Sequence, residues 1–140
     1  MGIGILHGKS GIQKLNVKSS TESELVGVSE YIPYNIWLIL FLQAQGYIIK
    51  NNILYQDNQS TILMLKNGRN SCTGNSRHIN IRYFFVKDRI EKEEIKVEYC
   101  PSRQMLADFF TKPLQGELFR KFRNVIMGYE PLSTLSGKDL

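Results

Sequence analysis

Three carboxylates lie at positions where acidic side chains can do chemistry. Glu24 falls in the first turn of a long helical pattern, and Asp57 directly follows the stretch ILYQ, where a strand gives way to a helix. Asp108 lies inside the short helical stretch SRQMLADFFTK. Carboxylate oxygens are the ligands that hard cations such as Mg²⁺ prefer, and two such ions can activate a water and stabilise the leaving oxygen of a phosphodiester. We therefore predict that the three carboxyl carbons converge to within roughly 10 Å of one another.

Each of the three acids also has a purely structural explanation. Residues 21–24 (TESE) fit a capping box, in which a Glu of the first turn bonds back to the cap residue. Asp57 could form an Asx turn or cap the following helix, although Asn58 could do the same. Asp108 could face solvent, but Asp is a poor helix former and this one comes too late in its helix to cap it. The residue pattern leaves these alternatives open.

The surrounding pattern predicts the elements that position these acids. Residues 2–7 and 13–17 alternate apolar residues with polar residues or glycine, so we predict two short strands joined in a hairpin. A long helix follows and ends at Gly46, with a kink or break expected at Pro33. Further helices are predicted over residues 59–66, 78–94, 102–110 and 117–127, strands over 53–56 and 95–99, and a basic loop over 69–77. Alternating strands and helices indicate an α/β architecture in one domain, residues 1–127, followed by a polar tail, residues 128–140.

Composition and charge narrow the class of protein. The 140 residues are 42% hydrophobic and 22% charged, as in an ordinary globular protein, and the net charge of +5 suits a polyanionic partner without requiring one. Cys72 and Cys100 are too few for a disulfide framework and indicate a reduced, intracellular setting. With His7 and His78 they could form a zinc site only by coincidence. The longest apolar run, residues 36–42, is far shorter than the ~20 residues of a membrane span, so no membrane partner is expected.

Four segments, in this order and spacing, resemble a known family. The segments SSTESELVGVSE, YQDNQSTILMLKN, RHINIRYFFVKDRI and EYCPSRQMLADFFTKPL are similar to the ribonuclease H region at the carboxyl end of copia-type retrotransposon polyproteins. The resemblance extends from about Leu6 to Met127. It implies an RNase H-like fold, a mixed sheet flanked by helices, in which four acidic residues hold two Mg²⁺ ions. It also implies hydrolysis of the RNA strand of RNA–DNA hybrids, with a reverse transcriptase domain upstream in the polyprotein.

The resemblance assigns individual residues to catalysis and binding. Glu24, Asp57 and Asp108 match the second, third and fourth catalytic acids, whereas Glu22 is the neighbour that caps the helix. Gln59 matches a position that touches the minor groove of the hybrid, and Ser20 and Thr21 could approach its backbone. Recognition of this kind reads shape, phosphates and 2′-hydroxyls. The remaining expected contacts are basic residues that could form a phosphate-facing patch or a merely solvated helix face: Lys112, Arg120, Lys121 and Arg123.

The sequence departs from the family pattern at its beginning. The first catalytic aspartate of the family lies on the first strand, which is the middle of a sheet with spatial order 3-2-1-4-5, yet no acid precedes Glu22 here. We therefore expect a sheet that lacks its central strand, in which residues 53–56 pair with 95–99 while the hairpin lacks its usual neighbour. Three functions stay open: an active ribonuclease H domain, a non-catalytic transposon remnant, and a nucleic-acid-binding module. His78 is expected to be structural.

Overall fold

The computed structural model describes residues 4–15, 17–67 and 77–136, which form two compact units. One unit comprises Gln13–Tyr99 and the other comprises Met1–Ile12 with Cys100–Leu140; each is described by itself. Most of the predicted basic loop, residues 69–76, falls outside the described residues, as do Cys72 and the last four residues of the predicted tail.

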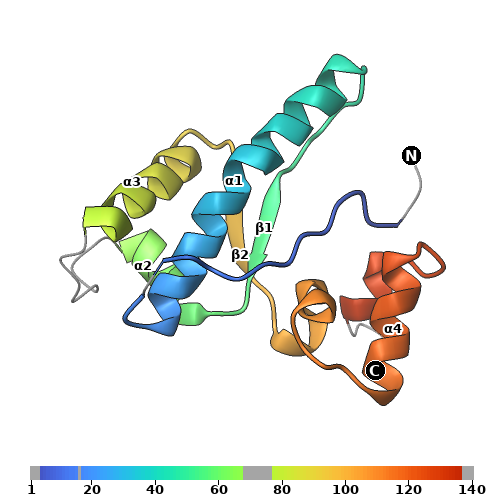
Figure 1. Ribbon diagram of the computed structural model, residues 1–140. Helices are drawn as coiled ribbons and strands as arrows, with labels where there is room; N and C mark the ends of the chain where they lie inside the picture. Colours follow the sequence, from blue (N-terminus) through green and yellow to red (C-terminus); the bar gives the residue numbers. More distant parts are fainter. Residues whose placement is uncertain (1–3, 16, 68–76, 137–140) are drawn as a thin grey trace. The chain divides into compact units, whose positions relative to one another are not determined.

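The larger unit places two parallel strands among three helices (Figure 1). Helix α1 (Ser20–Ala44) is followed by β1 (Ile53–Gln56), α2 (Gln59–Asn67), α3 (Arg77–Glu91) and β2 (Lys96–Tyr99). The two strands pair in parallel, with Ile53 opposite Lys96 and Gln56 opposite Tyr99. The predicted pairing of residues 53–56 with 95–99 is confirmed. Because parallel strands cannot be joined by a tight turn, α2 and α3 supply the crossover.

The core of this unit is built on the first half of α1. Leu25, Val28 and Ile32 recur at helical spacing and are buried, so they form the apolar face of the helix. Against this face pack Met64 and Leu65 of α2, Ile79, Tyr83 and Val86 of α3, and Ile95 before β2, together with the half-buried Leu54 and Val97 of the strands. The core therefore joins α1 to the crossover helices and to the sheet.

Helix α1 continues through Pro33, so the predicted break does not occur. Pro33 has no N–H to donate to the carbonyl of Ser29, but its ring is compatible with helical backbone angles. Ile32, directly before it, is fully buried in the core, and this packing holds the chain in the helix across the lost hydrogen bond.

The predicted N-terminal hairpin is wrong for the part of the chain that the structure describes. Residues 4–15 contain no strand, and within the described residues β1 pairs only with β2, which leaves its other edge bare. The segment bonds to helices instead: the Ile5 N–H donates to the carbonyl of Ile126, and the Gln13 amide exchanges hydrogen bonds with Ser23. A two-stranded hairpin is marginal in water without a further neighbour, which accounts for this outcome.

The second unit holds helix α4 and several 3₁₀ turns. The single helix predicted over residues 102–110 is instead two 3₁₀-helices, η2 (Ser102–Gln104) and η3 (Leu106–Phe110), because Met105 between them is extended. They are followed by α4 (Gly116–Ile126) and η4 (Leu132–Ser136). Phe122 and Val125 of α4 pack with Leu135, so the segment predicted as a polar tail contributes to this small core.

The turn between α3 and β2 is held by an ion network. Arg89 donates to both carboxylate oxygens of Glu94, at 2.9 and 3.2 Å, and to Asp88 at 2.7 Å. The hydrogen bond from Lys92, with the charges of Lys92 and Arg89 beside it, holds the pKa of Asp88 below its usual range. Glu93 adopts a left-handed conformation (φ 57°) that reverses the chain into β2.

Helix α1 is long and apolar enough to cross a membrane by length and composition alone. An 18-residue window of this helix has a mean hydropathy of 1.5, and 28% of that window is buried inside the structure. Core helices of soluble proteins meet the same criterion. Here the first half of α1 lies in the core, whereas large apolar side chains of its second half, including Trp37 and Leu40, are exposed.

Truncation of the α1 core face should destabilise the larger unit strongly. Leu25 is fully buried, so Leu25→Ala removes buried methyl groups and leaves a cavity, which lowers the free energy of unfolding by about 2–5 kcal/mol. Leu63→Ala is the matched control, because Leu63 is 54% exposed on α2 and its truncation should cost well under about 1 kcal/mol. Urea unfolding followed by circular dichroism measures both variants, and equal losses would contradict this assignment of the core.

Candidate active site

The N-terminus of α1 is capped by residues other than Glu24. Ser19 is the cap residue, and its hydroxyl accepts a hydrogen bond from the Glu22 N–H at 3.2 Å. The Glu22 carboxylate accepts in return from the Lys18 N–H at 2.8 Å, and Glu22 is buried. The capping box is therefore Ser19 with Glu22, not residues 21–24 with Glu24, and Glu22 is the capping acid that the sequence resemblance assigns.

The Glu24 carboxylate lies against the carboxyl end of β1. Glu24 is exposed, and one of its carboxylate oxygens accepts a hydrogen bond from the side-chain amide of Gln56 at 3.3 Å. Gln56, the last residue of β1, is only 4% exposed. The buried side-chain amide of Gln56 thus holds the Glu24 carboxylate of α1 at the end of β1. Gln56 directly precedes Asp57 in the chain.

The segment after β1 turns into α2 through Asn58. The Asn58 N–H donates to the Gln56 side-chain oxygen at 3.0 Å, and the Asn58 side chain accepts from the Thr61 N–H at 3.2 Å, which is a helix cap. The sequence left open whether Asp57 or Asn58 caps the following helix, and in the structure Asn58 makes this cap. Asp57, which stands between Gln56 and Asn58 in the chain, is half-buried.

A second hydrogen bond joins α1, which carries Glu24, to α2, which follows Asp57. Thr61, fully buried on α2, donates from its hydroxyl to the Thr21 carbonyl of α1 at 3.4 Å. The first turn of α1 and the first turn of α2 are therefore neighbours at the carboxyl end of β1. Open α/β sheets commonly place their sites at this end of their strands.

Asp108 is buried and paired, so the explanation of a solvated outer face is wrong for it. It lies in η3, is 9% exposed as a residue, and its carboxylate bonds to the Lys112 ammonium at 2.8 Å. The Asp108 carbonyl also accepts from the Lys112 N–H at 2.8 Å. The charge of a buried carboxylate requires a partner of this kind.

Glu24 and Asp57 belong to the larger unit, whereas Asp108 belongs to the smaller one. The structure brings the elements of the first two acids together, and the convergence of all three stays a prediction. Over the residues that the structure describes, no group of three or more His, Cys, Asp or Glu side chains is gathered closely enough to hold a metal ion. As donors, the three carboxylates suit a hard divalent cation.

The predicted nucleic-acid contacts fall into two groups. Ser20 and Thr21 begin α1 and Gln59 begins α2, the two helix starts that Thr61 ties together, and Ser20 and Gln59 are exposed. The second group lies in the smaller unit. Lys112 pairs with Asp108. On α4, Arg120 and Arg123 are exposed and Lys121 is half-buried.

One residue of the site, Gln56, and one pairing, Asp108 with Lys112, were missed at the level of sequence. Gln56 holds both Glu24 and Asn58, but an amide at the end of a strand carries no pattern that predicts this role. The pairing of Asp108 with Lys112 could have been found, because the two are four residues apart with opposite charges.

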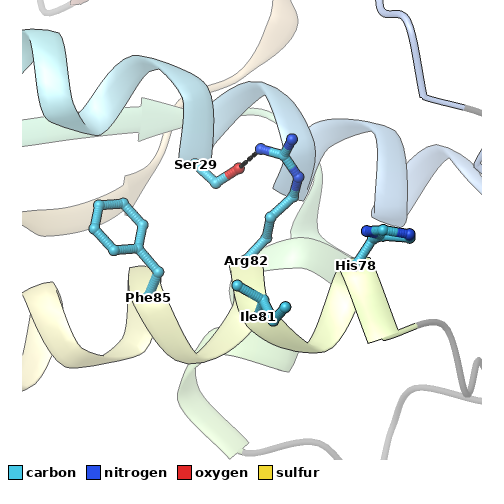
Figure 2. A pocket seen from close by; sticks show the side chains of 5 residues that line it. All are labelled: Ser29, His78, Ile81, Arg82 and Phe85. Atoms are coloured by element: carbon cyan, nitrogen blue, oxygen red, sulfur yellow. Dashed lines mark hydrogen bonds between the residues drawn. The ribbon is translucent and has the colours of Figure 1, made fainter.

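A pocket is lined by side chains of α1 and α3 (Figure 2). Arg82 of α3 donates to the Ser29 hydroxyl of α1 at 2.8 Å and pairs with Glu30 at 3.4 Å, so its charge is used to join the two helices. His78, Ile81 and Phe85 complete the lining. His78 is an exposed residue at this pocket, and its expected structural role stays a prediction.

Comparison with known proteins points to one class of relatives, the Pol polyproteins of retrotransposons. The chain is 29% identical over 123 residues, 88% of its length, to a retrovirus-related Pol polyprotein from transposon TNT 1-94 of Nicotiana tabacum. It is 28% identical over 115 residues to that of transposon RE1 of Arabidopsis thaliana, and 28% over 122 residues to a truncated transposon Ty1-A Gag-Pol polyprotein of Saccharomyces cerevisiae.

The chain spans about a tenth of the length of these relatives, 8–10% of each. No protein-family model and no solved structure matches it. The chain is thus homologous to a part of retrotransposon Pol polyproteins, and the motifs that resemble their ribonuclease H region are the basis for any finer assignment.

Removal of the α1 cap should destabilise the larger unit. Ser19→Ala deletes the hydroxyl that accepts from the Glu22 N–H, which costs about 1 kcal/mol. Ser20→Ala, one residue later, is the matched control and should change the free energy of unfolding little, because Ser20 is the first residue of the helix rather than its cap. Urea titration of the three proteins measures the difference; a loss in Ser20→Ala as large as in Ser19→Ala would contradict the assigned cap.

Removal of Lys112 should leave a buried carboxylate without its counter-charge. Lys112→Met should lower the free energy of unfolding by about 1–2 kcal/mol, since the Asp108 side chain is 12% exposed. Lys92→Met tests the same Lys–Asp spacing at the surface, where the Asp88 side chain is 43% exposed and the pair should contribute about 0–1 kcal/mol. If thermal and urea unfolding show equal losses of stability for Lys112→Met and Lys92→Met, burial of the Asp108 carboxylate does not strengthen its ion pair.

Proposed function

We propose that this chain is part of a retrotransposon ribonuclease H domain that hydrolyses the RNA strand of RNA–DNA hybrids. The observation that carries the proposal is the hydrogen bond from Gln56 to Glu24, which brings the acid of one motif against the strand end that bears the acid of another. Homology to retrotransposon Pol polyproteins supports the same lineage.

The chemistry of the donor set fits two Mg²⁺ ions. Glu24, Asp57 and Asp108 would hold them through carboxylate oxygens, and bound metal would activate the attacking water and stabilise the leaving oxygen of the phosphodiester. In the chain as described, the Lys112 ammonium balances the buried Asp108 carboxylate. Binding of a cation at Asp108 therefore requires Lys112 to move away or to share this carboxylate.

The remaining residues of the site would orient the hybrid. Ser20, Thr21 and Gln59 lie on the two helix starts beside Glu24 and Asp57, where hydroxyl and amide groups can bond to the sugar and phosphate backbone. Arg120 and Arg123, exposed on α4, supply positive charge for phosphates. Such contacts carry little base specificity, as degradation of any hybrid sequence requires.

Residues 1–140 provide only three of the four acids that the resemblance implies, because no acid precedes Glu22. The first aspartate of the family would be a further ligand of the metal ions. Loss of a residue of that kind costs several kcal/mol of transition-state stabilisation, and each 1.36 kcal/mol is a factor of about ten in rate. This chain by itself is therefore proposed to bind hybrid without cleaving it.

The experiment compares this chain with a fusion that adds a first strand bearing the missing aspartate. With Mg²⁺, the unextended chain should cleave a labelled RNA–DNA hybrid at background rate, whereas the fusion should cleave it. Asp57→Asn in the fusion should abolish cleavage, and Asp88→Asn, a surface Asp of α3, should leave it unchanged. A fusion that folds but does not cleave would contradict the enzymatic proposal, and robust cleavage by the unextended chain would contradict the need for a fourth acid.

A second candidate function, a nucleic-acid-binding module without chemistry, is favoured by the exposed arginines of α4. Hybrid binding by the unextended chain should weaken as salt rises, because phosphate contacts release counterions. Replacing Arg120 and Arg123 together by Gln should reduce the dependence of log K on log salt. If the fusion binds in this way but never cleaves, the binding module is the correct function.

A further inference from the structure

The second half of α1 carries an exposed aromatic surface, which we call the α1 stripe. Its members are the exposed residues Tyr31, Trp37, Leu40 and Phe41 and the half-buried Tyr34. Neighbouring rings along it are 6.2, 5.7 and 5.6 Å apart, centroid to centroid, from Tyr31 through Tyr34 and Trp37 to Phe41. Residues three or four apart share one face of a helix, so these side chains form a continuous row.

The stripe lies beyond the core of its own unit. The buried residues of α1 end at Ile32, and the helix then projects past α2 and α3 (Figure 1). Trp37 is 56% exposed, Leu40 59% and Phe41 47%. Large apolar side chains gathered at this density on a surface indicate an interaction site.

The lack of charged residues along the stripe restricts the kind of partner that it can bind. Helix α1 contains no Asp, Glu, Lys or Arg from Tyr31 to Ala44. Binding to nucleic acid relies on cations, which this surface does not offer. This uncharged part of the helix is about 21 Å long at 1.5 Å per residue. The whole of α1 is long enough to span a bilayer, but its first half is buried in the core, and the exposed uncharged part alone falls short of the ~30 Å hydrocarbon core. An uncharged, apolar partner surface of similar length is required, and a second α1 stripe meets this requirement.

The area of the stripe is sufficient for a dimer. A large aromatic side chain can bury about 150–250 Å². About half of each exposed member is accessible, so the stripe offers roughly 500 Å² on each copy. Specific interfaces bury about 800 Å² per partner, and about 500 Å² is the lower end for a biological contact. Two stripes therefore reach the lower end of this range without further contacts.

We propose that two copies of this chain associate through their α1 stripes around a two-fold axis. In such an arrangement the same patch serves on both copies, so the apolar row of one helix packs on the row of the other. The absence of charge along the stripe also means that bringing two identical surfaces together costs no like-charge repulsion. The proposal uses none of the acids of the candidate active site.

Trp37 provides a direct probe, because it is the only tryptophan in the sequence. As the concentration of the full 140-residue chain is raised through the micromolar range, the Trp37 emission maximum should shift to shorter wavelength. Sedimentation equilibrium should show a monomer converting to a dimer over the same range. Leu40→Glu keeps the probe and places two charges at the contact, so it should weaken association about tenfold or more.

Ile81→Glu is the matched control, since Ile81 is also 59% exposed on a helix of the same unit. It should dimerise as the unchanged protein does. Circular dichroism checks that Leu40→Glu is folded, and Phe41→Gln, a milder change in the same row, should also weaken the dimer. The proposal is overturned by equal losses in Leu40→Glu and Ile81→Glu, or by aggregates without a defined size.

Two further outcomes identify a different occupant of the stripe and also overturn the proposal. A protein that stays monomeric at all concentrations, with Trp37 emission already at short wavelength, has the stripe covered by its own chain. A monomer that sediments with phosphatidylcholine vesicles, with a Trp37 blue shift that follows lipid rather than protein concentration, uses the stripe to bind a lipid surface.

Discussion

Parallel pairing of β1 with β2 is the constraint on which the larger unit depends. Two parallel strands cannot be connected directly, so the chain must leave the sheet after Gln56, form α2 and α3, and return at Lys96. The crossover helices bury their apolar faces by packing on the first half of α1 and on the strands. This packing brings the capped start of α1 to the carboxyl end of β1, where the Gln56 amide meets Glu24.

The buried acids Glu22 and Asp108 each have a hydrogen-bond donor or a counter-charge beside them. Glu22 is buried and accepts a backbone N–H, and buried Asp108 has the Lys112 ammonium. Glu24, in contrast, stays exposed with one amide donor at 3.3 Å. An acid that neither caps a helix nor forms an ion pair in the described structure is available for a cation or a substrate. The hydrogen bond from Gln56 is therefore more informative about the role of Glu24 than the place of Glu24 in a sequence motif.

The two halves of α1 differ in how far their apolar side chains are buried. The first half is covered by α2, α3 and the strands, whereas the second half exposes aromatic side chains. Within the described residues β1 also has one bare edge, so both the helix and the sheet of this unit end in surfaces suited to further contacts. The proposed self-association addresses the helical surface. Assignment of an RNase H-like fold, which would place further strands beside β1, remains a proposal.

The sequence by itself determined the local elements of the larger unit. Periodicity located α1, α2, α3 and both strands. It could not decide which acid caps α1, because Ser19 with Glu22 and the neighbouring TESE run fit the same pattern. The folded structure decided this. Tertiary packing decided the burial of Asp108 and the fate of residues 4–15, which bond to helices and form no strand. The physical reason is that the burial of a carboxylate and the pairing of a strand depend on segments distant in the chain, which local spacing does not reveal.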